Sequence, residues 1–161
     1  MPEVEVGRGI RLFYEEFGEP SAPPLLLVMG LGAQLLSWDE QFCSALAERG
    51  FRVIRFDNRD VGLSTWLDEL GMPDFSGIAS GAADAPYTLP DLVDDACGLL
   101  DALGIDAAHV VGASMGGMIA QLMAIHRPEQ VLSLCSIMSF CDGAFGSVPA
   151  AFSAVSTDQV P

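Results

Sequence analysis

Basic residues are scarce in this chain. Its 161 residues contain 7 lysines plus arginines against 22 aspartates plus glutamates, which gives a formal net charge of −15 at pH 7. A field of that sign repels phosphate backbones and anionic membrane surfaces. We therefore expect neither nucleic acid nor a membrane as a partner.

Long apolar runs are lacking as well. The longest, residues 25–36, is interrupted by Gly30 and Gly32 and falls short of the ~18 residues that span a bilayer. The N-terminus is acidic and lacks the basic and apolar regions of a signal peptide. The sequence therefore predicts a cytoplasmic location.

Metal-ligand patterns are also missing. The chain has only two histidines, and its four cysteines contain no C-x-x-C pair, so we expect no metal site. Three of the cysteines lie on periodic apolar segments and are predicted to be small buried hydrophobes; these are Cys43, Cys97 and Cys135.

What the chain does have is a large apolar fraction, organised in alternating segments. Half of its residues are hydrophobic, which is enough to bury a single core. Strands are predicted over residues 4–6, 10–17, 25–29, 52–56, 109–112 and 131–138, and helices over 38–49, from a capping box at 88 to about 103, and over 115–125. The alternation predicts an α/β fold, a mostly parallel sheet with helices on both faces and a ligand site at the carboxyl ends of its strands.

The strongest chemical signal is the run Gly112–Gly116, with the sequence G-A-S-M-G. It follows an apolar strand and opens a helix, which is the setting of a nucleophile elbow. A tight strand-to-helix turn would hold the hydroxyl of Ser114 clear of the sheet, and glycines two positions before and after it remove side chains that would clash. We therefore predict that Ser114 is a nucleophile.

Two further motifs precede this one: Val28–Gly32 after the central strand and Asp57–Ser64 after the next strand. With the elbow, and with the segment Tyr87–Ile105 before it, they stand in the order found in α/β-hydrolases. From about residue 4 to 140 the chain resembles that superfamily, and more narrowly its small esterase, aclacinomycin-methylesterase-like and haloperoxidase-like branch.

The resemblance implies a serine hydrolase that acts on a carboxylic ester or similar acyl bond of a small molecule, without a metal or organic cofactor. By the same resemblance, the backbone N–H groups of Leu31 and Met115 form the oxyanion hole. Three neighbouring residues are candidates for lining the pocket or supporting the loop, with core packing as the alternative: Met29, Gly30 and Trp38. Asp57 and Arg59 could pair with each other and hold the second loop in place.

The base of a catalytic triad is missing from the pattern. His126 lies twelve residues after Ser114 along the predicted helix, roughly 18 Å away at the helical rise. His109 lies five residues before it on the strand, roughly 16 Å away. Neither can reach the serine, so both are expected at the surface. Asp142 is a candidate acid, because some families of this fold carry the acid after that strand.

The chain is expected to be the N-terminal part of a longer hydrolase. Residues 1–142 would form that part, and residues 143–161 would begin a cap region or a disordered tail. Relatives usually add a cap and further strands that carry the acid and the histidine, so the chain alone is expected to be inactive. The strand over 131–138 would then be an apolar sheet edge through which the chain could self-associate.

Three alternatives stay open from the sequence. Gly30-x-Gly32 and Asp57 partly fit a dinucleotide site, but Leu35 replaces the third glycine. The chain could instead be a non-catalytic remnant that binds a small ligand or a partner. A perhydrolase or other non-ester reaction would use the same scaffold.

Overall fold

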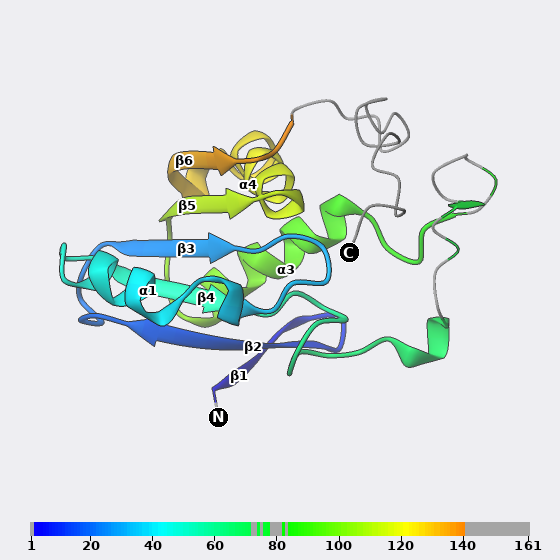
Figure 1. Ribbon diagram of the computed structural model, residues 1–161, viewed down its shortest axis with the longest axis horizontal. Coiled ribbons are helices and arrows are strands. Elements are labelled where there is room, and N and C mark those ends of the chain that lie inside the picture. The colour runs from blue at the N-terminus through cyan, green and yellow to red at the C-terminus, as the bar shows by residue number, and fades with distance from the viewer. Residues whose placement is uncertain (1, 72–73, 75, 78–81, 83, 141–161) are drawn as a thin grey trace, which may run out of the picture. The chain divides into compact units, whose positions relative to one another are not determined.

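The computed structural model describes residues 2–71, 74, 76–77, 82 and 84–140 (Figure 1). The chain divides into two compact units, residues 1–67 with 88–141 and residues 68–87 with 142–161. In the second unit the described residues include a short 3-10 helix, η2 (Asp68–Leu70). The first unit holds the sheet and the residues predicted to form the elbow.

Six strands form the sheet, in the order β1-β2-β4-β3-β5-β6. They are β1 (Glu3–Gly7), β2 (Ile10–Phe17), β3 (Pro24–Val28), β4 (Arg52–Phe56), β5 (Ala108–Ala113) and β6 (Val131–Ile137). The four strands from β4 to β6 in this order run parallel, whereas β1 and β2 pair antiparallel at one end. The predicted α/β fold with a mostly parallel sheet is confirmed.

The continuous apolar run of β3 follows from its central position. It pairs with β4 on one side and β5 on the other, and Leu26, Leu27 and Val28 are fully buried. A strand that is covered on both faces needs apolar side chains at successive positions rather than at alternate ones. This strand ends directly before the first loop of the candidate site.

Among the described residues, three helices cover the sheet, with α1 (Glu40–Ala47) on one face and α3 (Leu89–Ala102) and α4 (Met115–His126) on the other (Figure 1). Two short 3-10 helices, η1 (Leu35–Ser37) and η3 (Pro128–Gln130), accompany them. Helix α1 begins later than predicted, because the carboxylate of Asp39 caps it by accepting a hydrogen bond from the N–H of Gln41 at 2.8 Å. None of the helices in the described part of the chain has both the length and the hydropathy to cross a membrane.

Asp91 fixes the start of α3. Its carboxylate accepts hydrogen bonds from the backbone N–H of Thr88 at 2.8 Å and from the Thr88 hydroxyl at 2.7 Å, which confirms the predicted capping box. These bonds, with smaller contributions from Arg59 and Arg8, lower the pKa of Asp91 below its usual value of 3.8.

We expect the replacement Asp91→Asn to remove a pH-dependent part of the free energy of unfolding. Because the folded-state pKa of Asp91 lies below the unfolded-state value, its stabilising effect is complete above about pH 4 and is lost as the pH falls through the folded pKa. In urea unfolding, the stability gap between wild type and Asp91→Asn should be present at pH 7 and shrink at pH 3. Asp106→Asn, at an exposed carboxylate outside the cap, serves as control. A gap of equal size at both pH values would contradict this explanation.

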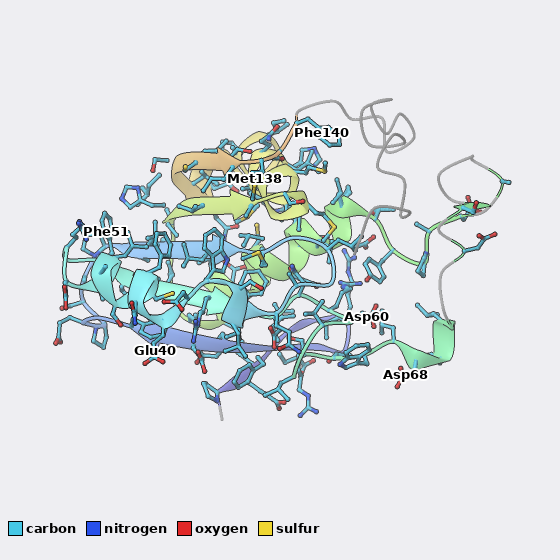
Figure 2. The ribbon with its side chains drawn as sticks, viewed as in Figure 1. Glu40, Phe51, Asp60, Asp68, Met138 and Phe140 are labelled. Carbon is cyan, nitrogen blue, oxygen red and sulfur yellow. The ribbon has the colours of Figure 1, made fainter. Side chains whose placement is uncertain are left out.

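Strand β6 lies at the edge of the sheet and is largely exposed. Large apolar side chains are therefore accessible along it and just beyond it, where Figure 2 labels Met138 and Phe140. The prediction that Cys135 is buried is wrong, because this edge strand leaves it exposed, whereas the predicted burial of Cys43 and Cys97 is confirmed.

Candidate active site

Ser114 occupies a strained turn between β5 and α4. Its backbone has φ 55° and ψ −123°, a region that residues with a side chain rarely adopt. The N–H of Ser114 donates to the carbonyl of Ile137 at 2.9 Å, and its own carbonyl accepts from Gly117 at 2.9 Å. The residue as a whole is exposed. The turn therefore holds the serine at the carboxyl end of the sheet, where the elbow pattern predicted it.

The glycines around Ser114 permit a very close approach of backbones. A Cβ atom at Gly112 would lie 2.1 Å from the carbonyl oxygen of Gly116. A Cβ atom at Gly116 would lie 2.2 Å from the carbonyl oxygen of Val28, the last residue of β3. Side chains at these positions would push the start of α4 away from the sheet, so the two glycines are needed for the turn.

The loop after β3 lies directly against the serine. A Cβ atom at Gly30 would be 3.0 Å from the Cβ and 3.4 Å from the Oγ of Ser114. The loop begins with a tight turn, in which the carbonyl of Gly30 accepts a hydrogen bond from the N–H of Ala33 at 3.3 Å. Gly32, at the third position of this turn, has φ 67°, as a type II turn requires. The bare backbone of Gly30 therefore faces the hydroxyl of Ser114.

The other residues predicted near this loop take different places. Leu31 is 66% exposed and Met29 is half-buried, while Met115 is the first residue of α4, so its N–H has no acceptor within the helix. Trp38 is 7% exposed and packs in a core cluster with Ala113, the residue before the serine. Its ring stacks on Phe42 with 5.8 Å between the ring centroids.

The loop after β4 makes contacts that differ from those predicted. Arg59 does not pair with Asp57; its guanidinium forms a two-pronged ion pair with Asp95 of α3, with both N–O distances at 2.6 Å. Asp57 instead accepts hydrogen bonds from the backbone N–H groups of Leu35 at 2.7 Å and Leu63 at 3.0 Å. The expectation of an Asp57–Arg59 pair is therefore wrong, because each side chain has a better placed partner elsewhere in the fold.

Sequence reasoning missed one residue next to the site. The side-chain amide of Asn58 donates to the carbonyl of Met29 at 3.0 Å and is buried. No pattern in the sequence distinguishes this asparagine from a polar loop residue. Its contact depends on the register between the parallel strands β3 and β4, which brings their two following loops side by side.

No histidine of the described residues stands at Ser114. His109 is the second residue of β5, where its Nδ1 lies 2.7 Å from the hydroxyl of Ser133. His126 is the last residue of α4 and is exposed. The candidate acid Asp142 lies outside the described residues. In residues 2–71 and 84–140, the nucleophile and the first loop are thus brought together without a base.

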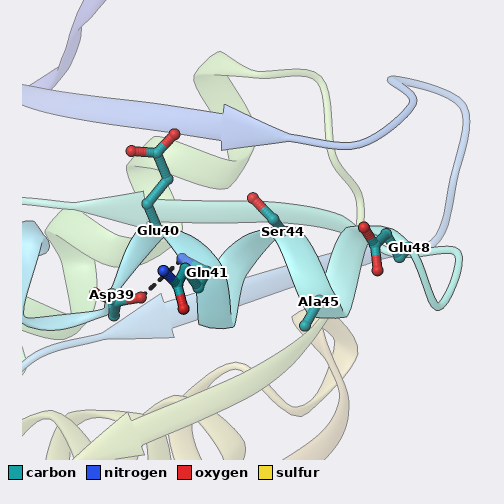
Figure 3. A pocket seen from close by; sticks show the side chains of 6 residues that line it. All are labelled: Asp39, Glu40, Gln41, Ser44, Ala45 and Glu48. Carbon is teal, nitrogen blue, oxygen red and sulfur yellow. Dashed lines mark hydrogen bonds between the residues drawn. The ribbon is translucent and has the colours of Figure 1, made fainter.

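A shallow hollow of about 570 Å³ lies along α1 (Figure 3), and Ser114 is not among the residues that line it. Its lining comes from that helix and its cap: Asp39, Glu40, Gln41, Ser44, Ala45 and Glu48. It is rich in carboxylates and includes nothing from the elbow or the loop after β3, so it is not the candidate acyl site. Within the described part of the chain, no group of three potential ligands could hold a metal ion.

Comparison with known proteins gives the family. Residues 23–156 match the family model described as alpha/beta hydrolase fold. The chain belongs to the α/β-hydrolase fold family. This membership, together with the six-stranded sheet, confirms the resemblance drawn from the three motifs.

Individual relatives carry names of several hydrolases. Rhodomycin D methylesterase DauP of Streptomyces sp. is 39% identical over 125 residues, which cover 78% of this chain and 38% of that protein. The putative carbamate hydrolase RutD of Variovorax paradoxus is 33% identical, over 76% of this chain and 40% of its own length. The crystal structure of the enol-lactonase from Burkholderia xenovorans matches with a TM-score of 0.69 and 30% identity, over 86% of this chain and 46% of that one. The chain thus spans about two fifths of the length of the relatives it matches.

Proposed function

We propose that this chain supplies the nucleophile and the oxyanion hole of a serine hydrolase that acts on a carboxylic ester or similar acyl bond of a small molecule. The observation that carries the proposal is the geometry at Ser114: a strained, exposed serine between a strand and a helix, with the backbone of Gly30 against its Oγ. The names of the relatives, an esterase, a lactonase and a carbamate hydrolase among them, favour acyl chemistry.

The proposed reaction is the transfer of an acyl group to Ser114. The hydroxyl oxygen attacks the acyl carbon and forms a new C–O bond, its proton passes to a base, and the bond to the leaving alcohol breaks. The negative charge that develops on the carbonyl oxygen is stabilised by the N–H groups of Leu31 and Met115, which are worth about 3 kcal/mol each in such sites. Water then releases the acid from the acyl-enzyme.

The proposal leaves the general base outside the described residues. A base must lie within hydrogen-bond reach of the serine, and His109 and His126 stand at the far ends of the strand and the helix that flank it. We therefore propose further that the 161-residue chain by itself has no esterase turnover above that of a Ser114→Ala variant.

Two measurements test these proposals. A fluorophosphonate, which needs the base but no turnover, should modify Ser114 in a gene product long enough to supply the base and fail to modify the Ser114→Ala variant of that product, while Ser37→Ala, at an exposed serine of η1, reacts like wild type. Intact mass and peptide mapping give the site. Modification at another serine, or no modification at all, would show that Ser114 is not the nucleophile. Hydrolysis of p-nitrophenyl acetate by the 161-residue chain, dependent on Ser114, would refute the second proposal.

The first measurement to make is the intact mass of the native gene product, with the reading frame sequenced beyond Pro161. A longer product that contains a late histidine and hydrolyses esters through Ser114 would identify the 161-residue chain as one part of an ordinary hydrolase. A product of 161 residues without turnover would keep the elbow but remove the assignment of hydrolysis.

A second proposal concerns partners: we propose that two copies of the 161-residue chain associate through strand β6. Its seven residues carry no charge, and Leu132, Leu134 and Ile137 are exposed along it. An uncharged edge strand lacks the usual protection against pairing with another strand. The net charge of −15 opposes the association, so salt should strengthen it by screening.

Sedimentation velocity tests the self-association. We expect a dimer at about 50 µM that becomes more populated at higher salt, and a monomer for Leu134→Lys, which places a charge on the edge. Leu70→Lys, at an exposed leucine of η2 that is not part of β6, is the matched control and should dimerise like wild type. A wild-type monomer at that concentration would overturn the proposal.

A further inference from the structure

The loop after β3, residues 29–35, has little support of its own. One hydrogen bond closes its turn, from the N–H of Ala33 to the carbonyl of Gly30, and at 3.3 Å it is long. Leu31 and Gly32 are exposed at the tip. The exposed tip of a loop closed by this bond would sample many backbone orientations, whereas an oxyanion hole depends on a fixed direction of its N–H groups. Something outside the loop must therefore hold it.

Two side chains of the neighbouring loop hold it at both ends. At the first end, the amide of Asn58 donates to the carbonyl of Met29 at 3.0 Å. At the last end, the carboxylate of Asp57 accepts from the N–H of Leu35 at 2.7 Å. Both side chains are only 3% exposed, so neither can contact a substrate directly, and any effect on reactivity has to pass through the loop backbone.

The bond from Asn58 to Met29 and the turn bond from Ala33 to Gly30 fix successive peptide planes. In a trans peptide the carbonyl and the N–H point in opposite directions. The bond from Asn58 therefore sets the direction of the Gly30 N–H as well as that of the Met29 carbonyl. In the next peptide, the turn bond to the carbonyl of Gly30 directs the N–H of Leu31 away from Ala33. The N–H assigned to the oxyanion hole thus depends on an orientation that starts at Asn58.

Asp57 is itself held in place by several contacts. The second carboxylate oxygen of Asp57 accepts from Leu63 at 3.0 Å, and a Cβ atom at Gly62 would come within 2.0 Å of it. The backbone of Asp57 donates to Phe13 of β2 at 3.0 Å and accepts from the hydroxyl of Ser64 at 2.6 Å. Because the carboxylate is enclosed on all these sides, a shift of Asp57 would break several bonds at once.

We propose that Asp57 and Asn58 are positioning residues. They bind the two ends of the loop over residues 29–35 and thereby fix the direction of the N–H of Leu31 for the reaction at Ser114. This inference rests on the proposed function, since it gives the loop the role of an oxyanion hole. It assigns to the loop after β4 a part in reactivity, and not only in the stability of the fold.

The test compares three variants of the chain. Asp57→Asn keeps the shape but offers one acceptor oxygen where two N–H groups need one each. Asn58→Leu keeps the approximate size and removes the donor. Asp60→Asn is the matched control, because the carboxylate of Asp60 also accepts from a backbone N–H in this loop, that of Leu67 at 2.6 Å, but it does not touch residues 29–35.

The first readout is the rate at which a fluorophosphonate modifies Ser114 when each variant is made in a gene product that supplies the base. We expect it to fall at least tenfold in Asp57→Asn and in Asn58→Leu and to stay within twofold of wild type in Asp60→Asn. Where the gene product hydrolyses esters, these two variants should lower its kcat and leave its KM unchanged, since the loop acts on the transition state more than on substrate binding. The second readout is amide hydrogen exchange by NMR, in which the N–H of Leu35 should exchange at least tenfold faster in Asp57→Asn.

The outcomes separate the two proposals. If Leu35 exchanges faster but the modification rate of Ser114 is unchanged, the positioning role is wrong and the function stands. An equal loss of reactivity in Asp60→Asn would also overturn it, because the effect would then be general loop damage. A wild-type gene product that supplies the base and is still never modified at Ser114 would overturn the proposed function, and the positioning role with it. If Asp57→Asn fails to fold, Asn58→Leu decides alone.

Discussion

The replacement Gly116→Ala is expected to destabilise the folded chain by about 3 kcal/mol, although alanine is the better helix former. A Cβ atom at this position would lie 2.2 Å from the carbonyl oxygen and 2.6 Å from the carbonyl carbon of Val28. Both are backbone atoms of the central strand, so no rotamer change can relieve the collision. In an exposed helix the same substitution would gain up to about 1 kcal/mol, and the sign of the effect is therefore the critical result.

Gly117→Ala is the matched control, one residue further along α4. There the nearest atoms belong to the side chains of Ser139 and Ser136, at 2.6 Å and 2.7 Å. The Oγ of Ser136 can rotate away, and the Cβ of Ser139 can shift with its backbone because Ser139 follows the last strand instead of lying within one, so we expect a loss of about 1 kcal/mol or less. Urea unfolding followed by circular dichroism measures both variants. A Gly116→Ala chain as stable as wild type would show that β3 and α4 are not in contact at the elbow.

The same substitution links stability to reactivity. If α4 moves away from β3 to accept the methyl group, Ser114 moves with it and leaves the backbone of Gly30. In a gene product that supplies the base, the remaining folded fraction of Gly116→Ala should then react with a fluorophosphonate more slowly than wild type. This result would distinguish a displaced elbow from a simple loss of folded protein.

The fold was largely predictable, because its main signals are local. The apolar run that became β3 needs burial on both faces, the capping box at Thr88 and Asp91 marks a helix start by direct hydrogen bonds, and the glycines around Ser114 mark a turn that no bulkier residue permits. Each of these patterns depends on residues that are close together in the sequence. Their order along the chain then restricts the connections between strands.

The errors share a different cause, which is dependence on distant parts of the chain. Arg59 pairs with Asp95, 36 residues away, instead of with its near neighbour Asp57, because the register of α3 over the sheet decides which carboxylate is close. Cys135 has an apolar environment in the sequence but lies on an edge strand. The role of Asn58 depends on two loops that meet only after β3 and β4 have paired.

The same difference between local patterns and long-range contacts decides which parts of the candidate site could be predicted. The nucleophile could be predicted, because a strained serine between two glycines is a local pattern with a local reason. The contact between Gly30 and Ser114 joins segments more than eighty residues apart and is known only from the structure. That neither histidine reaches Ser114 could also be predicted, because the rise per residue along β5 and α4 places both of them too far from the serine.

The buried pair between Arg59 and Asp95 gives the second large expected effect: Asp95→Ala should destabilise the folded chain by about 3 kcal/mol. The two side chains are 7% and 6% exposed, and two hydrogen bonds of 2.6 Å join them. Removing the carboxylate would take two charge-assisted hydrogen bonds from a guanidinium that lies in a largely water-free position.

An exposed ion pair provides the comparison. Arg127 and Asp94 are joined at 3.1 Å with side chains that are 46% and 36% exposed, and such pairs contribute about 0.5 kcal/mol. Arg127→Met should therefore have a small effect in the same urea unfolding experiment. A loss for Asp95→Ala no larger than that for Arg127→Met would show that water reaches Arg59 freely.

Replacing both partners of the buried pair should cost much less than replacing one. Burial raises the pKa of Asp95, with Arg59 opposing that shift, which means that the ion pair offsets only part of the desolvation cost of the charged carboxylate. Apolar side chains of similar size avoid that cost, so the double variant Arg59→Met with Asp95→Leu is expected within about 1 kcal/mol of wild type. Because Arg59 belongs to the same loop as Asp57 and Asn58, a stable double variant that reacts slowly at Ser114 would indicate that the pair serves the site by fixing this loop to α3.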